Sequence, residues 1–137
     1  MNLSHGHELI EHELTERIIG LAIEVHRHLG PGLLESAYEE CLAFELQQSG
    51  IECRRQVALP VVYKDIRLDC GYRMNIVAGR RLIIEVKAVE RILPIHEAQI
   101  LTYLRLSRLR VALLINFNIS FLRTVFGVSS CELSSSP

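Results

Sequence analysis

The sequence predicts a single α/β domain in which a mixed central sheet is flanked by helices. Three observations lead to this fold class. Apolar residues recur at helical spacing in the segments 14–29, 33–48 and 94–106. Short alternating or continuous apolar segments, which are typical of strands, lie between and after these helices. The length of 137 residues suits one domain.

The two helices of the first half end at strong breakers. The first helix, over 14–29, stops at the Gly-Pro-Gly sequence of residues 30–32. The second helix, over 33–48, is followed by Ser49-Gly50, and glycine is common just after a helix end. These breaks predict two separate helices rather than one long helix.

The middle of the chain is predicted to form short strands. Residues 56–63 alternate between apolar and polar, but Pro60 interrupts them and indicates a bend or a sheet edge. Lys64-Asp65 resembles a turn, and strands are expected to follow at 66–68 and 72–77. A tight connection then leads into the next strand.

The segment from Leu82 to Val89 is predicted to be the central strand. Six of its eight residues are apolar, and the two exceptions, Glu85 and Lys87, point to the same face because side chains alternate along a strand. Both faces are apolar enough to be covered, as in an inner strand. A carboxylate beside an ammonium suits a hard cation and the phosphate that it binds. A solvated ion pair is the alternative interpretation.

The last third of the chain predicts a helix and two strands. Pro94 is expected to begin the helix, with Ile95 and Leu101 among the residues that face inward. The nearly unbroken apolar run at 111–117 predicts a strand covered on both faces. A last strand is expected at 122–128.

Composition limits the function classes and the domain bounds. The net charge is −1, from 15 basic and 16 acidic residues, so contact with nucleic acid requires a local patch. The four cysteines have no CxxC spacing, which favours buried, reduced thiols in a cytoplasmic protein. No apolar run approaches the ~18 residues of a membrane span, so no membrane partner is expected. Residues 1–13 are predicted to be a flexible N-terminus, 14–128 the domain and 129–137 a disordered Ser-rich tail.

Four short motifs follow one another in this chain. They read GLLESAY at 32–38, EVKAVE at 85–90, QILTY at 99–103 and LLINFN at 113–118. Together, in this order, they resemble the PD-(D/E)XK nuclease superfamily and, more narrowly, its GxxExxY family of small bacterial proteins. The resemblance covers about residues 14–127 and implies a restriction-endonuclease-like core of one helix, three strands, a helix and a strand.

The resemblance also implies a role for each matching residue. Glu35 and Glu85 would be ligands of Mg²⁺ or Mn²⁺, and Lys87 would activate the attacking water and steady the charge on the scissile phosphate. Further residues would support the site or contact the phosphates of DNA or RNA. The supporting residues would be Tyr38, Gln99 and Tyr103, and the phosphate contacts would be Arg73, Arg80 and Arg81.

One position departs from the family pattern. Where the family has an Asp on the strand before Glu85, this chain has Asn75. Asn75 offers a neutral carbonyl oxygen to a cation in place of a negative charge. We therefore expect the metal to be held weakly, if at all, and cleavage to be slow or absent.

These residues leave three functions open. The first is an impaired, metal-dependent nuclease that hydrolyses phosphodiester bonds, with Glu35, Asn75 and Glu85 around the cation. The second is a catalytically inactive relative that binds nucleic acid or a protein partner in the same cleft. The third is a structural domain in which Glu85 and Lys87 form an internal salt bridge. An apolar content of 49% also leaves room for a homodimer interface.

Overall fold

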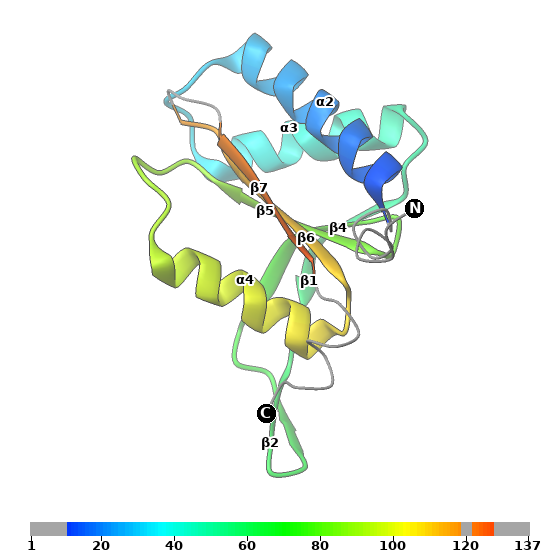
Figure 1. The fold of residues 1–137 in the computed structure, drawn as a ribbon, viewed down its shortest axis with the longest axis vertical. Coiled ribbons are helices and arrows are strands. Elements are labelled where there is room, and N and C mark those ends of the chain that lie inside the picture. Colours follow the sequence, from blue (N-terminus) through cyan, green and yellow to red (C-terminus); the bar gives the residue numbers. More distant parts are fainter. Residues whose placement is uncertain (1–10, 119–121, 128–137) are drawn as a thin grey trace, which may run out of the picture.

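A five-stranded sheet lies between two layers of helices in the computed structural model, which describes residues 11–118 and 122–127 (Figure 1). The strand order is β1-β4-β5-β6-β7, with β5 and β6 parallel and every other pair antiparallel. The predicted fold class, a mixed sheet flanked by helices, is therefore confirmed. The five strands are β1 (Cys53–Ala58), β4 (Arg73–Ala78), β5 (Leu82–Lys87), β6 (Val111–Asn116) and β7 (Leu122–Gly127).

Helices α2 (His12–Leu29) and α3 (Glu35–Gln48) cover one face of the sheet. Their apolar stripes pack on alternate residues of the central strands, as the predicted helical spacing requires. Residues that are fully buried in this layer include Ile18, Leu42, Leu46, Ile76, Ile84 and Leu113.

The loop between these helices is held by Tyr38. Its hydroxyl donates to the carbonyl oxygen of Gly30 (2.5 Å) and accepts from the backbone N–H of Leu33 (3.2 Å). Its ring stacks on that of Phe117, with centroids 4.6 Å apart. Because Gly30 and Gly32 have φ values of 69° and 101°, the loop uses a conformation that glycine adopts at little cost. The start of α3 is therefore fixed against the sheet.

Helix α4 (Pro94–Ser107) covers the opposite face. Its buried stripe is Ile100, Tyr103 and Leu104, whereas Ile95 and Leu101 are 67% and 50% exposed. The prediction that Ile95 and Leu101 face inward was therefore wrong. This helix carries apolar residues all round, so their spacing alone does not select the face that meets the sheet.

A two-stranded hairpin projects from the body of the molecule (Figure 1). It consists of β2 (Val61–Tyr63) and β3 (Ile66–Leu68), joined by Lys64 and Asp65, which both have positive φ. The predicted strand over 56–63 is thus divided at Leu59 and Pro60, where the chain leaves the main sheet. Proline lacks the N–H that a central ladder needs.

Several expectations concern the ends of the chain and the cysteines. Residues 1–10 of the expected flexible N-terminus, and the expected tail at 129–137, lie outside the described residues, and α2 begins at His12. Cys41 and Cys53 are half-buried against the core, whereas Cys70 is exposed, so the expected burial is partial for two of these free thiols and was wrong for Cys70. Cys131 lies outside the described residues. Within the described ranges, each helix is too short or too polar to form a membrane span.

Candidate functional site

The ladder between β4 and β5 ends before the two strands do. Pairing runs from Ala78 and Leu82 to Ile76 and Ile84, and beyond this point side chains replace backbone partners. The N–H of Asn75 donates to Oε1 of Glu85 (3.0 Å), and the N–H of Val86 donates to Oδ1 of Asn75 (2.8 Å). Because side-chain atoms lie between the strands, β4 and β5 diverge here while their backbone donors stay satisfied.

The divergence extends to β1 on the other side of β4. The register pairs Arg55 with Ile76 and Val57 with Met74 but leaves out Gln56, which has a left-handed conformation with φ of 52°. Its amide donates to Oε1 of Glu39 (2.8 Å), and Arg55 donates to the other oxygen of that carboxylate (3.0 Å). Glu39 is 4% exposed. A second carboxylate thus lies beneath the irregular part of the sheet, fully partnered by Arg55 and Gln56.

Glu85 is the most perturbed acid of the described residues. Its side chain is 4% exposed, and burial is the main cause that raises its pKa from 4.5 to about 7. The N–H of Asn75 and the charge of Lys87 lower this pKa, whereas the charges of Glu35 and Glu39 raise it further. Three carboxylates therefore interact electrostatically around the open ends of β4 and β5.

Glu35 reaches the same place from the first turn of α3. Its Oε2 accepts from the backbone N–H of Ala88 (3.3 Å), just beyond the end of β5, although the two residues are 53 positions apart in the chain. Glu35 is exposed and Glu85 is buried, and the charge of Glu35 is close enough to raise the pKa of Glu85. The structure thus brings together the two acids that the resemblance assigned to a metal.

Lys87 follows Glu85 on the same face of β5 and is half-buried. No ion pair shorter than 4.0 Å joins its ammonium to Glu85 or to any other carboxylate in the described part of the chain. Its charge nevertheless lowers the pKa of Glu85. The internal salt bridge between Glu85 and Lys87, which a purely structural domain would need, is therefore not formed. The ammonium of Lys87 is available to a ligand.

Helix α4 supplies the polar wall of the opening. Gln99 donates to the hydroxyl of Tyr103 (3.1 Å), as their spacing of four residues along the helix allows. Burial, and then the charge of Glu85, raise the pKa of Tyr103. The ring of Tyr72 meets that of Tyr103 edge-on at 6.3 Å. Gln99 and Tyr103 therefore border the site.

Two further residues that shape the site were not predicted from the sequence. Glu39 lies one turn after Glu35 on the same helix face, and this spacing was the available signal. Asn116 is 1% exposed, and its amide accepts from the N–H of Val89 (3.0 Å) and donates to its carbonyl oxygen (2.9 Å). Asn116 thus fixes the chain just after Lys87. In the sequence, Asn116 stands out as a polar residue at the end of a buried apolar segment.

The predicted phosphate contacts are not all near these acids. Arg73 begins β4 and donates to Asp69 (3.4 Å) and to the carbonyl oxygen of Tyr72 (2.9 Å). Arg80 and Arg81 lie at the β4–β5 turn, in ion pairs with Glu52 and Glu11. Arg81 precedes Glu85 by four residues, which is about 13 Å of strand. The structure therefore places Arg80 and Arg81 at the opposite end of the sheet from Glu85.

The donor atoms suit a hard cation with few protein ligands. Among residues 11–118 and 122–127, no three His, Cys, Asp or Glu side chains are grouped to hold a metal. Oε2 of Glu85 accepts no hydrogen bond from these residues, and Glu35 is the second carboxylate at the opening. Mg²⁺ is commonly held by one or two carboxylates and keeps several waters. The carboxylates of Glu85 and Glu35 fit this requirement.

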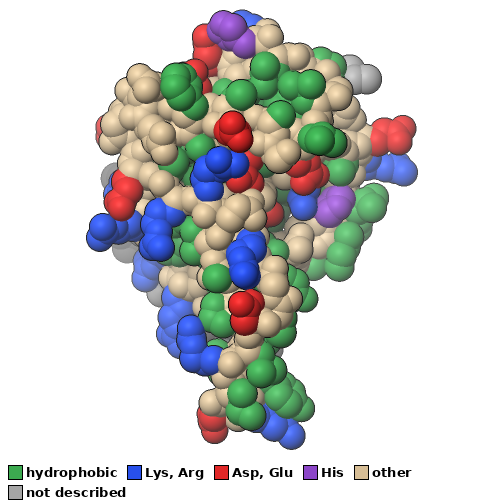
Figure 2. Space-filling model, turned by 180° about the vertical axis from the view of Figure 1, so that it is seen from behind, with side chains coloured by type: hydrophobic (Ala, Val, Ile, Leu, Met, Phe, Trp, Pro, Cys, Tyr) green, Lys and Arg blue, Asp and Glu red, His purple; other side chains and the backbone are tan. Residues whose placement is uncertain are grey.

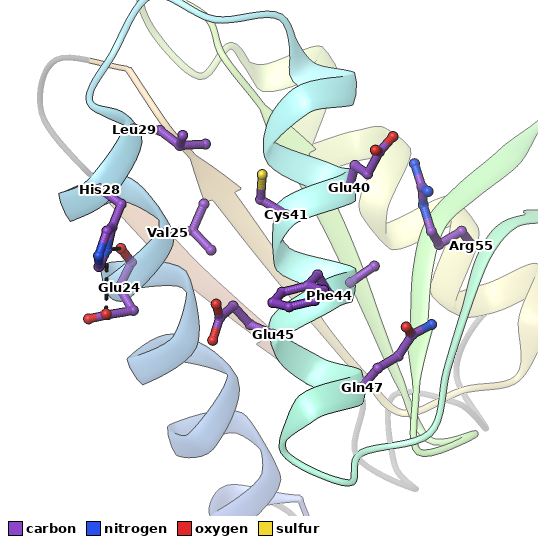
Figure 3. A pocket seen from close by; sticks show the side chains of 11 residues that line it. Glu24, Val25, His28, Leu29, Glu40, Cys41, Phe44, Glu45, Gln47 and Arg55 are labelled. Atoms are coloured by element: carbon purple, nitrogen blue, oxygen red, sulfur yellow. Dashed lines mark hydrogen bonds and ion pairs between the residues drawn. The ribbon is translucent and has the colours of Figure 1, made fainter.

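A wider hollow lies elsewhere in the described part of the chain. A groove of about 780 Å³ separates α2 from α3, and Val25, Leu29 and Cys41 point into it (Figure 3). Phe44 borders this groove and is 57% exposed. Glu85, Lys87 and Asn75 do not line it. The polar opening at β4 and β5 is therefore a separate feature, identified by its buried acid and not by its volume.

The fold and the site together define a class of protein. A mixed sheet between helices, with acids gathered where two central strands diverge and a lysine two residues further on, is the arrangement of a nuclease-like α/β protein. A family model described as the PD-(D/E)XK nuclease superfamily matches residues 12–126, and the chain belongs to this superfamily. No curated protein and no solved structure matches the chain.

Proposed function

We propose that this protein is a slow, metal-dependent phosphodiesterase that acts on DNA or RNA. The observation that carries the proposal is the meeting of Glu85, Glu35 and Lys87 at the diverging ends of β4 and β5. A buried carboxylate with a perturbed pKa, beside a second acid and an unpaired ammonium, is typical of a catalytic site. Membership of a nuclease superfamily supports nucleic acid as the substrate class.

Each side chain has a distinct task in this proposal. Glu85 and Glu35 would hold Mg²⁺ or Mn²⁺, which supplies charge stabilisation and a more acidic water when bound. Lys87 would orient the attacking water and neutralise charge on the scissile phosphate. Gln99 and Tyr103 would support the site from α4, and Tyr38 would support it by fixing the start of α3.

Two features support a slow reaction. Asn75 contributes no charge, and one lone pair of its carbonyl oxygen already accepts from Val86. In addition, a Glu85 pKa of about 7 means that a proton competes with the cation at neutral pH. Metal affinity is therefore expected to rise with pH through about pH 7, because binding requires the ionised carboxylate.

The proposal includes the GxxExxY family within the superfamily. In support, Gly32 has a positive φ within the loop, Glu35 reaches the end of β5, and Tyr38 holds the loop closed. The three residues that name the motif thus have separate physical tasks. A cytoplasmic location is also proposed, and the free thiols of Cys41, Cys53 and Cys70 support it.

Asn75 favours a second candidate function. Its amide satisfies the backbone of β5 without any cation, so the opening is held in shape in a metal-free protein. A catalytically inactive relative would use this preformed opening to bind nucleic acid, a protein partner or a second copy of the chain. The two candidates differ in whether a divalent cation and phosphodiester hydrolysis are involved.

The decisive experiment combines calorimetric titration with Mn²⁺ and cleavage of end-labelled DNA and RNA. Asn75→Asp is expected to raise the affinity for Mn²⁺ and the cleavage rate, and Glu85→Gln is expected to abolish both. Glu16→Gln, an exposed substitution on α2, is the control with the same change in charge as Glu85→Gln. Fast cleavage by the native protein that Asn75→Asp does not accelerate would contradict impairment. Nucleic-acid binding without cleavage by any variant would favour the second candidate.

A further inference from the structure

A second groove lies on the α4 side of the sheet. It has a volume of about 430 Å³ and runs between the β2–β3 hairpin, β1 and the C-terminal end of α4. Its walls include Pro60, Val62 and Leu109, and three arginines border it: Arg54, Arg67 and Arg80. The volume is within the range of about 300–1,000 Å³ that holds small organic groups.

The strand register directs two of these arginines into the groove. Arg67 is paired with Val62 across the hairpin, and directly paired residues share a face of a sheet. Arg54 is paired with Val77, which packs on the α4 side of the main sheet. Arg67 from the hairpin and Arg54 from β1 therefore approach the same hollow from two elements.

The positive charge of these two arginines is not compensated. Arg80 donates to both oxygens of Glu52 (3.0 and 3.1 Å). In contrast, Arg54 and Arg67 have no ion pair or hydrogen bond with any residue that the structure describes, and no acidic residue lines the groove. Figure 2 shows that Lys and Arg side chains gather along one edge of the molecule, above the projecting hairpin. Exposed arginines are usually solvated, but here they flank apolar walls.

We propose that this groove binds a single-stranded segment of nucleic acid, with its phosphates at Arg54 and Arg67 and its bases against the apolar walls. Guanidinium groups recognise phosphate oxygens in a bidentate manner. A single strand presents phosphates and base faces together, whereas a duplex encloses its base faces in the stack. Met74, which lines the groove, precedes Asn75 on β4.

This inference rests on the proposed function only in taking nucleic acid as the partner, and it does not require cleavage. Binding is therefore measured in EDTA, by the fluorescence anisotropy of a short labelled single strand and of the same strand annealed to its complement. The test variant is R54Q/R67Q, and the matched control is R17Q/R27Q, which removes the same charge from α2 on the other side of the sheet. Circular dichroism and thermal melts confirm that both variants fold.

The expected effects follow from counterion release. Each phosphate contact to a single strand contributes about 0.7 to the slope of log affinity against log salt. Loss of two contacts should lower this slope by about 1.4 and, at about 0.1 M salt, weaken binding by roughly 25-fold (10 to the power 1.4). R17Q/R27Q should bind like the native protein, the duplex should bind more weakly than the single strand, and Mn²⁺ binding should be unchanged in R54Q/R67Q.

Four results would overturn the inference. They are the absence of single-strand binding, equal binding by R54Q/R67Q and the native protein, equal binding of duplex and single strand, and equal displacement of the strand by poly-glutamate of matched charge. Loss of binding confined to R54Q/R67Q supports the groove whether or not the native protein cleaves. Absence of cleavage counts against the proposed hydrolysis alone, because the EDTA experiment measures only binding.

Discussion

Replacing Glu85 by Gln should stabilise the protein at alkaline pH and not at acid pH. The pKa of Glu85 is about 7 in the folded protein and 4.5 when the group is unperturbed. Below pH 4.5 the group is protonated in the folded and unfolded states, so its burial carries no ionisation cost. Above pH 7 it is ionised in both states, and the rise of its pKa from 4.5 to about 7 corresponds to about 3 kcal/mol of lost stability.

Gln cannot ionise, so Glu85→Gln removes this cost. Its stability relative to the native protein should rise by about 3 kcal/mol between about pH 4.5 and pH 8, a difference on the order of 10 °C in Tm. Any constant effect of the new amide cancels when the two pH values are compared. Urea denaturation at both pH values measures the difference, and Glu16→Gln is the control with the same change in charge. A stability difference between Glu85→Gln and the native protein that does not vary with pH would refute a perturbed Glu85.

Two further substitutions test the surroundings of the site. Tyr38→Phe removes the hydroxyl that joins Gly30 to Leu33, and it should lower the free energy of unfolding by about 1–2 kcal/mol in urea denaturation; an unchanged free energy would show that Tyr38 does not hold this loop. Lys87→Met removes a charge that lowers the pKa of Glu85, so the pH dependence of stability should move to higher pH, while stability at low pH changes little. A loss of several kcal/mol at neutral pH in Lys87→Met would instead indicate a buried ion pair between Lys87 and Glu85.

The elements were largely predictable because each has a strong local pattern. The strand from Leu82 onward is apolar on both faces, and it pairs with neighbours on both sides as the pattern predicts. The helix that begins at Pro94 was also predicted, but its inward face was not, because residues such as Ile95 are apolar on its exposed side. The side of a helix that meets the sheet is decided by packing, and a sequence with apolar residues all round leaves that choice open.

The site residues that belong to a sequence motif could be predicted. Those that come together only through the fold could not. Glu35 and Glu85 were expected together from the resemblance, and the structure places both at one opening. Glu39 acts through Arg55 and Gln56 of a different element, and its role depends on the left-handed conformation of Gln56. No local spacing predicts a contact of this kind, since it exists only once α3 lies on the edge of the sheet.

Asn75 provides the hydrogen bond that keeps β4 and β5 apart, but it adds no negative charge. The amide oxygen of an Asn or a carboxylate oxygen of an Asp can accept from the N–H of Val86, so either residue would keep β4 and β5 apart. An Asp at this position would add a negative charge beside Glu85, whose pKa Glu35 and Glu39 already raise, and a bound metal ion would offset that repulsion. With Asn75 the opening is complete without metal. The metal-free Asn75→Asp protein should therefore be less stable than the native protein above pH 7, and Mn²⁺ should restore its stability, because binding to the folded state alone raises the free energy of unfolding.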